Sequence, residues 1–308
     1  MTTTTPPLIA EPTMNGRQLK AAMRAQDAKT KLASPWASGI AIVIALLWTV
    51  PTIGLLTNSV RAEPGSTTSG WWTFFRDVPF TFNNYSKAWT GNGTGTPMSS
   101  FLLNSIVITL PAVVIPISLA LLAAYAFAWI DFRGKNFLFI AIFVMQIVPI
   151  QVALVPLLKI YVGLGWQNSF WSIWLSHTIF GLPLAIFLLH NFMKEIPASL
   201  VEAARVDGAG HVRIFLQVLM PLLVPAIASF GIFQFLWVWN DLLVAITFSN
   251  NNTAPITKGI QGLAGALDTS SKNLLPAGAI FAMIVPLAVF LGLQRFFVRG
   301  LLAGSVKG

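Results

Sequence analysis

The sequence is poor in the residues from which catalytic and metal centres are built. None of its 308 residues is cysteine, which excludes disulfide scaffolds and thiolate metal sites. The only histidines, His177, His190 and His211, are too far apart for an H-E-x-x-H motif, and neither G-x-S-x-G nor D-x-x-D occurs. We therefore expect no catalytic site and no metal site in this chain.

A phosphate-binding loop is also missing from the sequence. The nearest candidate, Gly134-Lys135, lacks both the first glycine and the Ser or Thr of the G-x-x-x-x-G-K-[ST] motif. The chain is therefore expected to bind neither ATP nor another cofactor itself.

Charged residues are scarce, at 9% of the chain, while hydrophobic residues make up 55%. A soluble domain carries roughly 25% charged residues, so this composition indicates a protein of the lipid bilayer. The net charge of +9 comes from basic residues spread between apolar segments. Because they form no single basic patch, nucleic acid is not expected as a partner.

Six apolar segments are long enough to cross a hydrocarbon core of about 30 Å. The predicted fold class is therefore an all-α membrane protein, in which residues 1–35 form an N-terminal arm, 36–299 the transmembrane domain and 300–308 a tail. Prolines within the second and third segments are expected to kink their helices. The predicted spans are 36–57, 101–130, 136–158, 169–192, 222–248 and 273–294.

Basic residues predict the orientation of these spans. Lys and Arg number five in the arm, two in 131–135, three in 194–213 and three in 295–308, against six in the segments of the opposite face. Since cytoplasmic loops carry the excess of positive charge, both termini are expected to be cytoplasmic. The arm lacks the charged start and cleavage site of a signal peptide. We expect a multi-pass protein of the bacterial cytoplasmic membrane.

The polar loop 194–221 lies between the fourth and fifth predicted spans. Ser199 and Glu202 form an S-x-x-E pattern, which predicts a helix capped by Ser199. Gly208 is expected to end that helix in a left-handed turn, and a second helix is expected to begin from Gly210.

This loop resembles a motif of permease subunits of ABC importers. Glu202-Ala203-Ala204, then Gly208, then Val218, Met220 and Pro221 match EAA-x3-G-x9-I-x-L-P, with Val for Ile and Met for Leu. An isolated EAA is common in helices because Glu and Ala favour them, but the spaced glycine and proline favour the family motif. The resemblance implies a coupling helix that docks on a cytoplasmic ATPase through Glu202, Ala203, Ala204, Asp207 and Gly208.

Other segments resemble the carbohydrate branch of these permeases, of the maltose or α-glucoside type. They are FNNYSKAW near residue 83, WLSHTIFGLPLAIFLLHNFM around His177, and FGIFQFLWVWNDLLVAITF around Asp241. The resemblance implies a type I importer permease that carries a sugar. It also implies a second permease subunit, two ATPase subunits that bind ATP and Mg²⁺, and an extracytoplasmic solute-binding protein as partners.

Asp241 is the single carboxylate inside a predicted span, where a charge costs roughly 2.5 to 3.5 kcal/mol. Such a group is expected to face a water-filled path or a partner. Sugar hydroxyls need polar groups and sugar rings stack on indole, so a translocation path can be predicted from Asn104, Gln151, Trp237, Asn240 and Asp241. Alternatively, Asp241 caps a broken helix or pairs with a partner subunit, and the amides join helices at about 0.6 kcal/mol each.

Two other functions remain open at this stage. The EAA-type loop is shared by importers of other solutes, so the substrate could belong to another class. A secondary transporter that works alone is disfavoured, because such folds usually show internal repeats and intramembrane ion-coupling charges that this sequence lacks.

Overall fold

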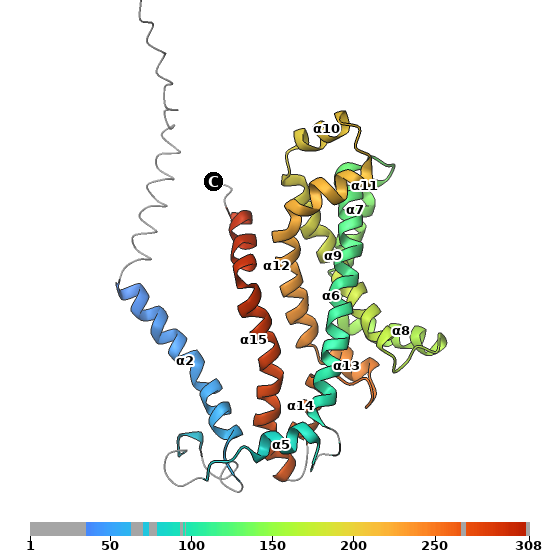
Figure 1. The fold of residues 1–308 in the computed structure, drawn as a ribbon. Helices are drawn as coiled ribbons and strands as arrows, with labels where there is room; N and C mark the ends of the chain where they lie inside the picture. The colour runs from blue at the N-terminus through green and yellow to red at the C-terminus, as the bar shows by residue number, and fades with distance from the viewer. Residues whose placement is uncertain are drawn as a thin grey trace, which may run out of the picture. The chain divides into compact units, whose positions relative to one another are not determined.

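The computed structural model describes residues 35–62, 70–73, 79–92, 95, 97–265 and 269–305, and side chains only for part of the last range. The predicted arm, except for Pro35, and the last three residues of the tail lie outside these ranges. The described residues are nearly all helical, and their one β pairing is an isolated bridge between Arg61 and Phe80 (Figure 1). The chain divides into two units, 1–54 and 55–308, which are described separately.

Five helices in the described residues are long and apolar enough to cross a membrane. The first, α2 (Pro35–Ser59), contains the unit boundary, and its side chains up to Gly54 are almost all exposed. The others belong to the second unit. They are α6 (Met98–Trp129), α9 (Phe170–Glu195), the continuous segment His211–Trp239, and Leu274–Gln294 within α15 (Thr269–Ser305). The all-helical membrane fold is thus confirmed.

The predicted third span, 136–158, consists of two helices. α7 (Lys135–Met145) and α8 (Ile150–Gly163) are bent by 98° at the short break between them. Pro149 has φ −60° and ψ 130°, an extended conformation, and stands directly before α8. Proline lacks an N–H and disfavours helix at the preceding residue, which explains why the break falls here. By contrast, α6 continues through both Pro111 and Pro116.

The predicted fifth span is also interrupted. α12 (Met220–Trp239) ends before residues 240–242, and the short α13 (Leu243–Phe248) follows. The next loop, predicted without a helix, contains α14 (Ile256–Gly265). The earlier loop contains η1 (Trp71–Thr73) and α5 (Asn83–Thr90), and α15 continues to Ser305 through much of the predicted tail.

The main core of the second unit lies where α6, α9 and α12 meet. Ala120, Ala124 and Ala185 are fully buried there, and the small side chains allow the helices to approach closely. Phe230 of α12 and Leu189 of α9 fill the space between the backbones. This core fixes the three helices whose ends carry the candidate functional residues.

Candidate functional site

The loop 194–221 contains the predicted pair of helices. α10 (Ala198–Val206) is followed by α11 (His211–Arg213), with Gly210 immediately before α11, as predicted. The predicted capping box is wrong, because Pro197 holds the N-cap position and Ser199 lies inside the helix without a capping bond. Proline fixes φ near a helical value and has no N–H to satisfy, so the helix starts earlier than the S-x-x-E pattern suggests.

The turn after α10 is a Schellman motif. Gly208 has φ +79°, its N–H donates to the carbonyl of Arg205 at 3.0 Å, and the N–H of Ala209 donates to the carbonyl of Ala204 at 2.9 Å. The left-handed conformation favours glycine, which confirms the predicted helix end at Gly208. No atom lies within 4 Å of a Cβ built at this residue, so its surroundings within the chain are open.

α10 has one buried and one exposed side. Val201 is 1% exposed and, with Ala204 and Ala209, packs against the main core. Glu202, Ala203 and Asp207 are exposed, as is the apolar Val206 at 88%. In Figure 1 α10 lies at the end of the second unit opposite α5 and α14. The buried side thus holds the helix against the core, while charged and apolar side chains remain exposed on the other side.

Behind α11 the chain forms a π-helix, labelled η2 (Ile214–Leu219), before α12 begins. The hydroxyl of Tyr125, near the end of α6, lies 2.7 Å from Nδ1 of His211. The Tyr125 ring also contacts the ring of Phe215 in η2, with centroids 5.3 Å apart. The loop is therefore joined both to α6 and to α12.

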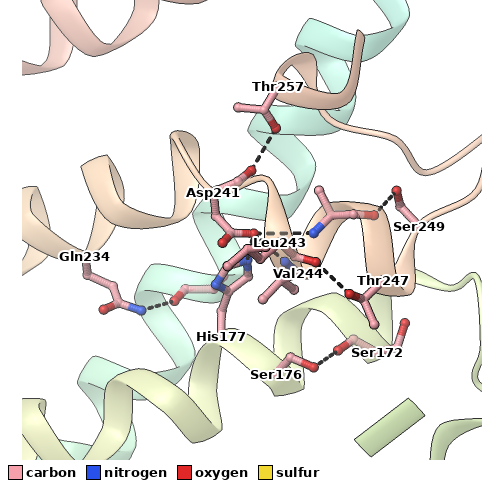
Figure 2. Close-up of polar contacts among 12 residues, drawn as sticks. Ser172, Ser176, His177, Gln234, Asp241, Leu243, Val244, Thr247, Ser249 and Thr257 are labelled. Atoms are coloured by element: carbon pink, nitrogen blue, oxygen red, sulfur yellow. Dashed lines mark hydrogen bonds and ion pairs between the residues drawn. The ribbon is translucent and has the colours of Figure 1, made fainter. Parts of the chain in front are cut away.

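Asp241 caps the second of two consecutive helices. Its Oδ2 accepts from the N–H groups of Val244 and Ala245 at 2.9 and 3.3 Å, at the start of α13 (Figure 2). Nε2 of His177, a side chain only 2% exposed, lies 4.0 Å from the same oxygen. Thr257 of α14 donates to the Asp241 carbonyl at 2.8 Å. The geometry favours the capping alternative for this carboxylate.

The three amides among the predicted path residues do not gather around the Asp241 carboxylate. Asn104 donates to the carbonyls of Asn252 and Ala254, at 2.9 and 3.0 Å, and so fastens the loop after α13 to α6. Asn240 donates to the Leu236 carbonyl within its own helix, and Gln151 is exposed on α8. The three amides therefore lie at different places in the fold and do not form one polar cluster.

Lys258 fastens the same loop from α14. Its ammonium group donates to the carbonyl and to Oγ of Ser249, at 2.7 and 3.2 Å. Burial lowers the pKa of Lys258 from its usual value, because the surroundings disfavour the charged form. The two oxygens of Ser249 replace part of the lost hydration.

A cavity of about 520 Å³ opens at the break between α7 and α8. Of the five predicted path residues, only Trp237 lines it. Gln234, 1% exposed, was missed by the sequence analysis, and its Nε2 donates to the Ala112 carbonyl at 3.2 Å. A glutamine inside an apolar run was the available signal. The lining is Met145, Gln146, Ile147, Val148, Pro149, Ile150, Ala153, Ile179, Phe180, Gly181, Pro183, Leu184, Phe233, Gln234 and Trp237.

Within the part of the chain that the structure describes, no three His, Asp or Glu side chains come together as a metal site. The expectation that this chain binds no cofactor stays a prediction.

Comparison with known proteins defines the class of this chain. Residues 116–303 match the family described as "Binding-protein-dependent transport system inner membrane component". The chain belongs to this family, which confirms the resemblance seen in the EAA-type loop. It is thus a non-catalytic, multi-pass permease subunit of the ABC transporter class in the cytoplasmic membrane.

Among its relatives is the osmoprotective compounds uptake permease protein GgtD of Synechocystis sp., 47% identical, with 86% of this chain and 90% of the relative covered. The alpha-glucoside transport system permease protein AglG of Rhizobium meliloti is 46% identical, with 74% of this chain and 61% of the relative covered. A bacterial ABC transporter involved in the import of the acidic polysaccharide alginate has the same fold. Its TM-score is 0.73 at 19% identity, and 93% of this chain and 100% of that chain are covered.

Proposed function

We propose that the chain is one of two permease subunits in an ATP-driven importer, and that it carries an α-glucoside, maltose-type or trehalose-type sugar inward. The observation that carries this proposal is the loop 194–221, whose helix is anchored on the core and leaves Glu202 and Asp207 exposed, in a chain that lacks a phosphate-binding loop. A second permease, two ATPase subunits holding ATP and Mg²⁺, and a solute-binding protein complete the importer.

Relatives support a sugar as the substrate. AglG is named for α-glucoside transport. Another relative is the "Melibiose/raffinose/stachyose import permease protein MelC" of Bacillus subtilis, which is 33% identical, with 87% of this chain and 95% of the relative covered. A second candidate substrate is an osmoprotective compound, which the name of GgtD favours at 47% identity.

Purification of the tagged protein from its native membrane tests the proposal. A second permease and an ATPase are expected to co-purify, and α-glucosides with the binding protein are expected to stimulate ATP hydrolysis. Stimulation by small osmoprotectants alone would select the second candidate. A protein that purifies alone and supports uptake driven by an ion gradient would contradict both and favour a secondary transporter.

In this proposal α10 is the coupling helix. Glu202 and Asp207 are placed to pair with basic residues of the ATPase, and Ala203 leaves room for close approach, since all three are exposed. Ala204 anchors the helix on the core side. Closure of the ATPase dimer would move α10, and the helices joined to it would convert that movement into alternating access.

Gly208→Asp tests the role of this helix. The open space around Gly208 accommodates the new side chain within this chain, at a cost of roughly 1 kcal/mol for the left-handed backbone. The added carboxylate would instead meet the surface of the partner ATPase. We therefore expect uptake to fall at least tenfold, while the permease still inserts into the membrane.

Gly210→Asp is the matched control, because Gly210 has φ −74° and holds an N-cap position that suits aspartate. It is expected to retain uptake. Equal activity of both variants would refute the assigned role of Gly208, and equal loss would show a general effect of charge in the loop.

A further inference from the structure

The hydroxyl of Tyr125 and the imidazole of His211 join two segments that are 86 residues apart in the sequence, at 2.7 Å. Tyr125 lies in the last turns of α6, where it is 7% exposed. His211 is the first residue of α11, directly after the turn that ends with Gly210. A hydrogen bond at this point fixes the loop 194–221 to a helix other than the two that it connects.

The aromatic contacts around this bond reach into the π-helix. The Tyr125 ring meets the His211 ring edge to face, with centroids 6.0 Å apart, and the Phe215 ring at 5.3 Å. Ile214 and Leu219, the first and last residues of the π-helix, are buried in the same core. Tyr125 therefore contacts both the start of α11 and the segment through which α11 continues into α12.

A π-helix is rare, because its wider turn is less stable than the α-helical one. Where it occurs, it is often at a functional site. Here it lies between the exposed loop and α12, the helix that supplies Phe233, Gln234 and Trp237 to the cavity. A segment of this kind can change its winding without separating the buried residues at its ends. It is thus suited to take up displacement between the loop and the cavity.

We propose that Tyr125 and His211 are positioning residues for energy coupling. Their hydrogen bond holds the loop 194–221 against α6 in the conformation seen here. When the bond is made, the π-helix transmits movement of the loop to α12. When the bond is broken, the π-helix absorbs that movement. This inference rests on the proposed coupling role of α10, and it assigns to the two residues no contact with ATP or with the substrate.

Tyr125→Phe tests the bond, because it removes only the hydroxyl and keeps the ring against Phe215. A neutral hydrogen bond typically changes an equilibrium by roughly two- to tenfold. We expect the amount of substrate imported per ATP hydrolysed to fall by roughly that factor. Assembly with the ATPase and thermal stability are expected to stay close to those of the wild type.

Substitutions of His211 separate a hydrogen bond from simple packing. In His211→Asn the side-chain amide takes the place of Nδ1 and can either accept from or donate to the Tyr125 hydroxyl, so this variant is expected to retain the import ratio. His211→Leu can neither accept nor donate, so its import ratio is expected to fall to the same extent as that of Tyr125→Phe. The double variant Tyr125→Phe with His211→Leu is expected to be no worse than either single variant.

Three results would overturn the inference. They are a full import ratio in Tyr125→Phe, independent losses that multiply in the double variant, or loss of the co-purifying ATPase from either single variant. Failure of the proposed function is recognised separately, since wild-type complexes would then show no ATP-driven uptake, and the inference would fall with it.

Discussion

At the scale of single residues, Asp241 shows how backbone hydrogen bonds can hold a carboxylate in an apolar segment. Its Oδ2 accepts two backbone N–H groups that the break between α12 and α13 leaves without helical partners. His177, beside the same oxygen, also contacts the ring of Trp237 at a centroid distance of 5.5 Å. The carboxylate therefore contributes to the shape of the helix break next to the cavity.

Substitution of Asp241 distinguishes a cap from a substrate contact. Asp241→Asn keeps one acceptor oxygen, so we expect near-normal uptake and stability. Asp241→Ala removes the cap, and we expect the free energy of unfolding to fall by about 1 kcal/mol. Thermal unfolding in detergent and the KM for uptake measure the two effects. A KM raised more than tenfold in Asp241→Asn, with unchanged stability, would favour a direct substrate contact instead.

The cavity can be tested by cysteine labelling, because the chain has no cysteine of its own and a single one can be introduced at Ala153 in the lining. In the Ala153→Cys variant, a water-soluble maleimide is expected to label the cavity, and the transported sugar is expected to slow the labelling at least twofold. Gln261→Cys, at an exposed position of α14 outside the lining, is the control and is expected to react at the same rate with or without sugar. Identical behaviour of the two variants would exclude the cavity from the path.

At the scale of elements, α14 is packed closely against α6. A Cβ added at Gly259 would lie 2.5 Å from Cδ2 of Phe101, a distance that requires the ring or the helix to move. Gly259→Ala is therefore expected to lower the free energy of unfolding by about 1 to 3 kcal/mol. The midpoint of thermal unfolding in detergent measures this loss.

Gly262→Ala is the matched control in the same helix, because no atom lies within 4 Å of its added Cβ. Alanine favours helix over glycine by about 1 kcal/mol, so this variant is expected to be at least as stable as the wild type. If both alanine variants are equally stable, the close packing of α14 on Phe101 is not a determinant of stability.

Sequence patterns predicted some elements well because those elements depend on local properties. Apolar length alone identifies a span, and the left-handed turn at Gly208 follows from the freedom of glycine. Pro149 illustrates the limit. It precedes α8 at a 98° bend, whereas Pro111 and Pro116 lie inside an unbroken helix, so the presence of a proline does not by itself predict where a helix breaks. The cavity was not predictable because its lining comes from α7, α8, α9 and α12 together.

At the scale of the whole molecule, the proposed function depends on the orientation of the chain in the membrane. Within the second unit, α10 lies at one end and α14 at the other, and α15 runs from the α14 end toward the α10 end (Figure 1). The loop 194–221 carries Lys194, Arg205 and Arg213. The positive-inside rule therefore predicts that the α10 end and the C-terminus both face the cytoplasm.

Reporter fusions measure this orientation directly. A fluorescent protein fused after Gly308 is expected to fluoresce and alkaline phosphatase at the same point to be inactive, whereas phosphatase fused after Asn251, in the loop between α13 and α14, is expected to be active. The opposite pattern would place Glu202 and Asp207 outside the cell, where no ATP-hydrolysing partner could reach them. The orientation is thus a necessary condition for the coupling role of α10, and with it for the proposed contribution of Tyr125 and His211.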